Sequence, residues 1–410
     1  FAPAPWGDLD TVRDRATNLP LLRLPSGFSY VSYGWTGDPL PGDVPTPNSH
    51  DGMGVVRVAD GRAVLVRNHE IRNRGPAFAS APVYDPRARG GTTTLVFDLG
   101  AGRWESARAS LAGTSANCAG GVTPWGTWLT CEETMLHARA PHGFVFEVPA
   151  DGDAIPEPLT ALGCFSHEAI AVDPTTGVLY ETEDHERAGF YRFIPNTPGQ
   201  LRRGGRLQML RVVDRHGVRL VRHLAVGTVL PVDWVDIGDP ELVHGTATPD
   251  GNGVLWQGRL LGAATFRRLE GCWWGDDGVY FISTDGGEAS AGQIWHYHPS
   301  RAQLRLALEA GGGSGLDLPD GATSLPSGAW LVHEDARRSA ARLIVVAADG
   351  RIWPFAESAV VLAGERNGIV GDHRDAPWSG LTFAGDWLFV NLERPGITVA
   401  ITGPWARLRA

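Results

Sequence analysis

The chain has 410 residues, of which 43% are hydrophobic and 20% are charged, so it can bury a large core and lacks the composition of a disordered protein. No segment approaches the roughly 18 consecutive apolar residues of a membrane-spanning helix. The net charge is −10 and no basic cluster occurs, which excludes the usual nucleic-acid binders. All 36 basic residues are arginine, so no lysine can act as a nucleophile or bind phosphate.

One pattern recurs along the chain: a glycine-containing turn, a short β-rich run and then an acid. It occurs at residues 60–70, 123–133, 173–184, 275–285, 325–335 and 384–393. A repeat of about 50 residues is typical of a four-stranded propeller blade. The wider third interval contains a similar turn and strand at residues 248–258, which could form a seventh blade, but these lack the terminal acid. We therefore predict a single all-β domain over residues 1–410, a six-bladed β-propeller with an insertion near residues 196–262.

This architecture predicts where the polar residues meet. The first strand of each blade lines the channel and the second runs antiparallel to it, so the start of the first and the end of the second share one face. The expected starts lie at residues 48–51, 117–118, 166–168, 268–270, 320 and 379, and the ends are the acids of the repeat. Both sets should converge at one channel mouth. An N-terminal strand at residues 27–33 should complete the last blade and remove its free edge.

Carboxylates gathered at one mouth repel each other, by several kcal/mol at ~4 Å in a partly buried site, and so favour bound cations. A rigid ring of oxygen ligands suits Ca²⁺, whereas the thiolate of Cys118 indicates a transition metal such as iron. Taken singly, each acid could be a solvated strand end, and Cys118 could be a small buried hydrophobe. His296 and His298 alternate on one expected strand, and we interpret them as packing or solvent-facing residues.

Several stretches resemble the PhoX family of bacterial alkaline phosphatases. They are residues 68–70 (NHE), 117–133 (NCAGGVTPWGTWLTCEE), 166–195, 268–271 (RLEG), 283–299 and, more weakly, 379–396. The resemblance implies a six-bladed propeller with a metal cluster of Fe³⁺ and Ca²⁺ at the channel mouth. It also implies hydrolysis of small-molecule phosphate esters. The chain begins at Phe1, which favours a processed N-terminus and, with the resemblance, a periplasmic or secreted monomer exported by the twin-arginine route.

The resemblance also implies roles for individual residues. Cys118, Glu168 and Glu270 correspond to iron ligands, and Arg268 corresponds to the residue that clamps the phosphate. Arg268, Glu270 and Glu168 are thus the expected catalytic residues. The calcium side corresponds to Glu132, Glu133, Glu183, Asp184, Glu334 and Asp335. The family's characterised branch uses a lysine near the phosphate, and this chain could replace it with Arg67, Arg72 or Arg187.

Two other functions remain open from the residues. One is a calcium-dependent propeller hydrolase, such as a lactonase or a phytase, which needs calcium but no thiolate. The other is a non-enzymatic binding propeller whose metals only hold the blades together.

Overall fold

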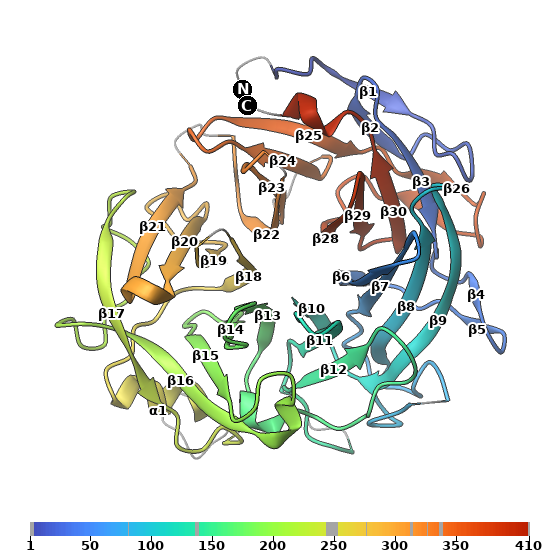
Figure 1. Cartoon of the computed structure of the whole chain (residues 1–410). Helices are drawn as coiled ribbons and strands as arrows, with labels where there is room; N and C mark the ends of the chain where they lie inside the picture. The colour runs from blue at the N-terminus through green and yellow to red at the C-terminus, as the bar shows by residue number, and fades with distance from the viewer. Residues whose placement is uncertain are drawn as a thin grey trace.

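In a computed structural model of the chain, six blades of antiparallel β-strands surround a central channel and form a propeller (Figure 1). The structure describes residues 4–80, 82–135, 139–242, 253–275, 277–311, 315–325, 327–335 and 339–408. The predicted six-bladed, all-β architecture is confirmed. Among the described residues no helix is long and apolar enough to cross a membrane, and the α-helix present, α1 (Gly253–Leu260), has 8 residues.

Each blade is an antiparallel sheet whose first strand lies at the channel. The first three blades contain β6 (His50–Ala59), β7 (Arg62–His69), β8 (Gly90–Asp98) and β9 (Arg103–Thr114); β10 (Asn117–Val122), β11 (Thr127–Glu132) and β12 (Val145–Pro149); and β13 (His167–Val172), β14 (Leu179–Glu183), β15 (Phe190–Pro195) and β16 (Gly205–Val212). The fourth and fifth contain β18 (Leu269–Trp274), β19 (Val279–Ser283), β20 (Gln293–His298) and β21 (Gln303–Glu309); and β22 (Pro319–Ser324), β23 (Trp330–Glu334), β24 (Arg342–Val346) and β25 (Ile352–Ser358).

The sixth blade closes the ring with strands from both ends of the chain. It contains β28 (Trp378–Ala384), β29 (Trp387–Leu392), β30 (Ile397–Thr402) and the N-terminal strand β3 (Ser29–Tyr33), which pairs antiparallel with β30. The predicted N-terminal closing strand is therefore present, and described residues near both termini, such as Trp6 and Leu408, pack in one hydrophobic cluster. Two further N-terminal strands, β1 (Leu9–Val12) and β2 (Leu22–Pro25), extend the fifth blade through pairing of β2 with β25.

The expected insertion at residues 196–262 contains β16, which is the fourth strand of the third blade. It also contains β17 (Val229–Asp236), which pairs with β16 on one side and with β21 on the other. This strand joins the third and fourth blades into one continuous sheet. Of the expected strand at residues 248–258, residues 248–252 lie outside the described part of the chain, and the rest belong to α1.

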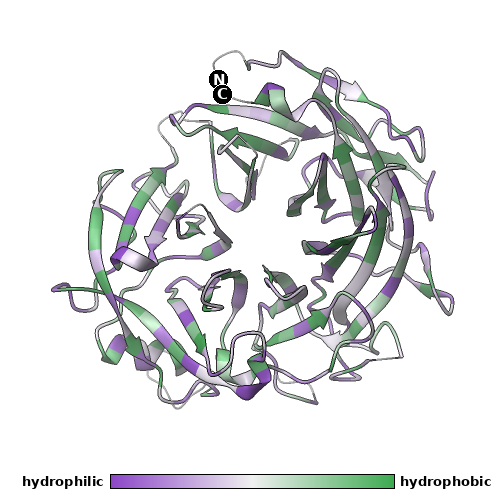
Figure 2. Ribbon diagram, in the orientation of Figure 1, coloured by the Kyte–Doolittle hydropathy of each residue, from purple (hydrophilic) through white to green (hydrophobic). Residues whose placement is uncertain are grey.

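Small elements complete the described structure at the periphery. They are the hairpins β4 (Pro39–Leu40) with β5 (Val44–Pro45) and β26 (Val361–Ala363) with β27 (Val370–Asp372), and the 3₁₀ turns Thr160–Leu162, Leu201–Arg203, Pro299–Arg301 and Trp405–Leu408. Hydrophobic segments recur on the strands of every blade (Figure 2).

A hydrophobic cluster fills each contact between neighbouring blades. In β24, Leu343 and Val345 pack toward the sixth blade, whereas Ile344 and Val346 pack toward the fourth. Successive side chains of a strand point to opposite faces, so a strand between two blades needs apolar residues at every position. Each such side chain contributes about 1.5–3 kcal/mol when fully buried.

The N-terminal closure depends partly on one buried hydroxyl. Tyr30 of β3 is fully buried, and its hydroxyl accepts a hydrogen bond from the Leu21 amide at 2.9 Å and lies 3.1 Å from the Val12 carbonyl. We expect Tyr30→Phe to lower the free energy of unfolding by about 1–3 kcal/mol, because buried polar groups lose their partner. Thermal melts measure the change. Tyr33→Phe on the same strand is the control, and equal effects of the two substitutions would contradict this role for Tyr30.

Candidate metal and phosphate site

A β-bulge interrupts each inner strand where it enters the channel mouth. In β6, for example, His50 pairs with His69 and Met53 with Arg67, so two residues of β6 face one of β7. Register shifts occur at the corresponding places of β10, β13, β18, β22 and β28. Bulges re-aim side chains next to functional sites. Here the bulged segments carry Asp51, Cys118, Glu168, Glu270 and Asp320, which all line the cavity at the mouth.

The second strands deliver their own acids to the same place. Glu70, Glu133, Asp184, Asp335 and Glu393 each follow directly after the last residue of a second strand and line the same cavity of about 420 Å³. The predicted convergence of strand starts and strand ends at one mouth is thus present for five of the six repeats. In the fourth, the terminal acid Asp285 pairs with Arg267 at 2.8 Å and does not line this cavity. Two arginines also line this cavity, Arg72 and Arg268.

One group of ligands comes from the third, fourth and fifth blades. Carboxylate oxygens of Glu168, Glu270 and Asp320 lie within 4.8 Å of one another. Oε2 of Glu168 is buried and has no hydrogen-bond partner within the described part of the chain. Buried carboxylate oxygens are normally paired, so this oxygen is available to a cation.

A second group comes from the first and second blades. Glu70, Cys118 and Glu133 also place one ligand atom each within 4.8 Å of one another, and Sγ of Cys118 lies 3.6 Å from Oδ2 of Asp51. Two carboxylates and a sulfur thus lie close together, and a third carboxylate adjoins the sulfur. A soft sulfur beside hard oxygens fits a transition metal, and the surplus oxygens fit calcium.

Each cavity arginine bridges acids from two blades. The Arg268 guanidinium donates to Asp184 at 3.1 and 3.2 Å and to Oε1 of Glu270 at 2.9 Å. Arg72 pairs with Oε1 of Glu70 at 2.5 Å and with the Glu133 carboxylate. The two arginines therefore neutralise only part of the acidic charge.

Burial and crowding change the pKa values of the acids at the mouth. Burial raises the pKa of Glu133 to about 8 although Arg72 opposes the rise, and burial together with Glu70 raises the pKa of Glu393 to about 7. Burial and neighbouring carboxylates hold the pKa values of Glu168 and Glu270 well above the usual range. Asp320 differs: burial raises its pKa, but His333, together with Arg268 and a hydrogen bond with Glu270, outweighs that effect and lowers it. Without cations, several of these groups would carry protons at neutral pH.

Three of the expected calcium ligands do not line the cavity. Glu132 is fully buried and accepts hydrogen bonds from the Ser115, Gly143 and Phe144 amides, with His142 Nδ1 at 2.6 Å. Glu183 accepts from the Gly189 amide and the Tyr191 hydroxyl, and Glu334 pairs with Arg342. Each of the three is the last residue of its strand and pairs in register with the inner strand. The neighbouring acid, one residue later, faces the channel instead.

The other expected residues do line the cavity. Cys118, Glu133, Glu168, Asp184, Arg268, Glu270 and Asp335 are all in its wall. Four further acids in the wall, Asp51, Glu70, Asp320 and Glu393, were not among the expected ligands. Their signal in the sequence was the repeat itself, because each occupies a strand start or a strand end.

Among the arginines considered as a replacement for lysine, only Arg72 lines the cavity in the described structure. Arg67 is fully buried and donates to Thr398 Oγ1 at 2.7 Å and to the Gly34 carbonyl at 3.1 Å, so it joins the first blade to the sixth. Arg187 is half-buried away from the cavity.

Two backbone features hold the site together. A Cβ at Gly121 would lie 2.1 Å from the Ile170 carbonyl oxygen, so only glycine allows β10 and β13 to approach this closely. Arg268 adopts φ = 43°, an uncommon left-handed conformation for a residue with a side chain. Its amide donates to the His185 carbonyl at 2.8 Å and its carbonyl accepts from the Thr284 amide at 3.0 Å, which fixes this conformation.

The raised pKa values predict how the metal-free protein responds to pH. Glu133 and Glu393 bind protons more tightly folded than unfolded, where glutamate titrates near 4.5. Their stabilising effect is present below about pH 4.5 and is lost as the pH rises through about 7 to 8. In chelator-treated protein we expect Tm to fall between pH 5 and pH 8, and Glu133→Gln to reduce that fall. A Tm that is constant or rises over this range would contradict the prediction.

Comparisons with known proteins agree with this fold. Residues 7–111 and 105–396 match the family model described as alkaline phosphatase PhoX. The structure of Pseudomonas fluorescens PhoX in complex with vanadate, a transition state analogue, superposes with a TM-score of 0.67 at 18% identity, covering 96% of this chain and 98% of that chain.

A gluconolactonase from Xanthomonas campestris gives a TM-score of only 0.42 at 12% identity, covering 98% of this chain and 96% of that chain. No curated protein sequence matches the chain.

Proposed function

The chain belongs to the PhoX family of alkaline phosphatases, and we propose that it hydrolyses phosphate monoesters at the channel mouth with iron and calcium ions held by the cavity carboxylates and Cys118. The enzyme class follows from the family: the chain is a phosphoric monoester hydrolase of the alkaline phosphatase type. The metals, their ligands and the residue roles are the proposal.

The observation that carries the proposal is the composition of the cavity wall. Carboxylates from all six blades and the thiol of Cys118 share a cavity whose arginines offset only part of the acidic charge. Such a wall would repel a phosphate anion unless multivalent cations reverse the local field. Bound iron and calcium ions would bind the phosphoryl oxygens and increase the electrophilicity of phosphorus.

We assign the ligands from the two groups at the mouth. Glu168, Glu270 and Asp320 form one set, and Cys118 with Glu70 and Glu133 forms the other. Asp51 adjoins Cys118, and Asp184, Asp335 and Glu393 supply further oxygens in the same wall. Glu132, Glu183 and Glu334 act instead as buried acceptors that hold the strand ends.

Arg268 is the proposed phosphate clamp. Its guanidinium presents several donors in a plane and suits two phosphoryl oxygens at once. In the described structure these donors bind Asp184 and Glu270. Cations that take over those carboxylates would leave the guanidinium for the substrate, where its hydrogen bonds strengthen as negative charge spreads over the phosphoryl oxygens.

Arg72 is the proposed second cation of the phosphate site. Its side chain is 51% exposed at the mouth while its partners Glu70 and Glu133 are largely covered. It can therefore contact an arriving anion while remaining tethered to the wall. This position makes it the replacement for the family's lysine.

Hydrolysis of p-nitrophenyl phosphate by metal-loaded protein tests the role of Arg268. We expect Arg268→Met to lower kcat/KM by about 100- to 1,000-fold, as loss of one donor to transition-state charge typically does. Arg267→Met is the matched control, because Arg267 pairs with Asp285 at 2.8 Å and does not line the cavity. Metal content is measured for each variant. A fully loaded Arg268→Met enzyme with unchanged kcat/KM would refute the assignment.

Metal analysis tests the ligands separately from activity. We expect purified protein to contain iron and calcium and to absorb visible light through sulfur-to-iron charge transfer. Cys118→Ala should lose that absorption and Glu270→Gln should lose bound iron. Cys164→Ala should retain both, since Cys164 is buried beside the His142 carbonyl and does not line the cavity. Calcium without iron, together with lactone turnover and no phosphatase activity, would favour a lactonase-type enzyme instead.

The proposal includes a location outside the cytoplasm. Members of the family are periplasmic or secreted. We propose export by the twin-arginine route and action as a monomer on small phosphate esters, without a nucleic-acid partner. Cell fractionation and size-exclusion chromatography test the location and the monomer, and recovery of active enzyme only from the cytoplasm would refute export.

A further inference from the structure

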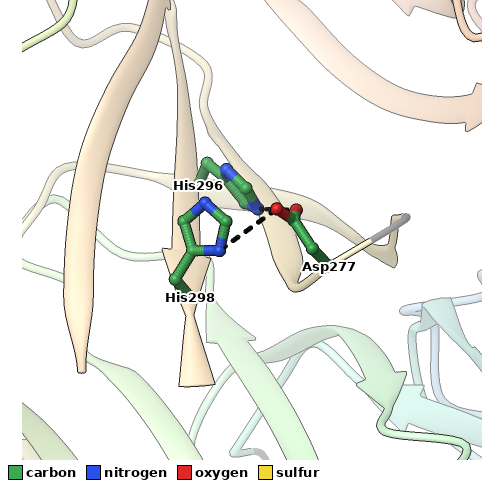
Figure 3. A group of neighbouring side chains, drawn as sticks. All are labelled: Asp277, His296 and His298. Carbon is green, nitrogen blue, oxygen red and sulfur yellow. Dashed lines mark ion pairs between the residues drawn. The ribbon is translucent and has the colours of Figure 1, made fainter. Parts of the chain in front are cut away.

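A second group of ligand-type side chains lies at the opposite end of the fourth blade. β18 begins at the mouth with Glu270 and runs away from it to Trp274, and the turn that follows carries Asp277. β20 returns to that far end, where Tyr297 pairs with Val279. His296 and His298 of β20 both point toward Asp277 (Figure 3).

The atoms of this group are spaced as metal ligands are. Nε2 of His296 lies 3.2 Å from Oδ1 of Asp277, and Nδ1 of His298 lies 3.4 Å from Oδ2 of the same carboxylate. Ligands about 2.0 Å from a tetrahedral zinc ion lie about 3.3 Å apart. Residues i and i+2 of a strand share a face, so the backbone of β20 presents both imidazoles together.

The geometry favours a metal-ligand role for His296 over a simple ion pair with Asp277. Nε2 of His296 is buried and makes no well-aligned hydrogen bond in the described structure, despite its short distance to Asp277. The side chain of His296 is 4% exposed and its ring stacks on Tyr280 at 4.0 Å, with the ring planes 6° apart. A rigid, buried nitrogen that lacks an aligned proton partner is suited to donate its lone pair to a metal.

We propose that Asp277, His296 and His298 bind one Zn²⁺ or a similar divalent transition metal ion. Two imidazoles and a carboxylate are a common zinc ligand set. Asp277 is 56% exposed, so a fourth position faces solvent and can take water. The ion would link the turn between β18 and β19 to β20, at the end of the fourth blade opposite the channel mouth.

The surrounding charges set the limits of this site. Arg301 and Arg305 oppose a cation near His296, but both side chains are exposed and therefore screened by solvent. The proposal is independent of the phosphatase site, since none of the three ligands lines the cavity at the mouth.

Zinc titration of the full chain, with the metal sites at the channel mouth loaded beforehand, tests the proposed zinc site. We expect the wild type to bind one more Zn²⁺ per chain than His298→Ala or Asp277→Asn, and zinc to raise Tm in the wild type only. His223→Ala is the matched control, because Nδ1 of exposed His223 lies 3.0 Å from Oε1 of Glu288 and no third ligand joins this pair in the described part of the chain. It should bind zinc as the wild type does.

Two results would overturn the proposal. The first is equal zinc stoichiometry in the wild type and in Asp277→Asn, a change at an exposed turn that preserves side-chain shape. The second is X-ray absorption of the additional zinc that lacks imidazole scattering. If His298→Ala failed to fold, Asp277→Asn alone would decide, with loss of the extra zinc supporting the site and its retention refuting it.

Discussion

Repulsion among carboxylates at the channel mouth is the constraint on which the site depends. Acids from every blade are held in one cavity by a rigid ring, so they cannot move apart to relieve their mutual charge. Burial together with this repulsion raises the pKa of Glu133 to about 8 and that of Glu393 to about 7. Cation binding relieves the same repulsion without protonation, and it converts an anion-repelling surface into one that attracts phosphate.

The blades impose this arrangement through their backbone rather than through the acids themselves. A bulge in each inner strand turns a side chain into the channel, as it does for Cys118, Glu168 and Glu270. Glycines such as Gly121 let neighbouring inner strands approach within contact of the main chain. Hydrophobic clusters between blades then fix the ring against the electrostatic stress at its centre.

Much of this could be predicted from the sequence, and the remainder depended on backbone detail. The repeated turn, strand and acid indicated six blades, and β3 closes the sixth as expected. The acids were harder to place, since adjacent residues of a strand point to opposite faces. In the pairs Glu132–Glu133 and Glu183–Asp184, the register alone decides which member reaches the channel. The family resemblance pointed to both members of each pair, and only the backbone register shows that the first member is a buried hydrogen-bond acceptor.

The pairing of β3 with β30 also has a consequence for biosynthesis. The ring cannot close until residues 397–402 have left the ribosome, although β3, which pairs with them, is made long before. Asp51 and Glu393 lie far apart in the order of translation, and they line the same cavity where the first and sixth blades meet. The full set of cavity acids is therefore assembled only once the ring has closed, although the two ligand groups at the mouth come from the first five blades.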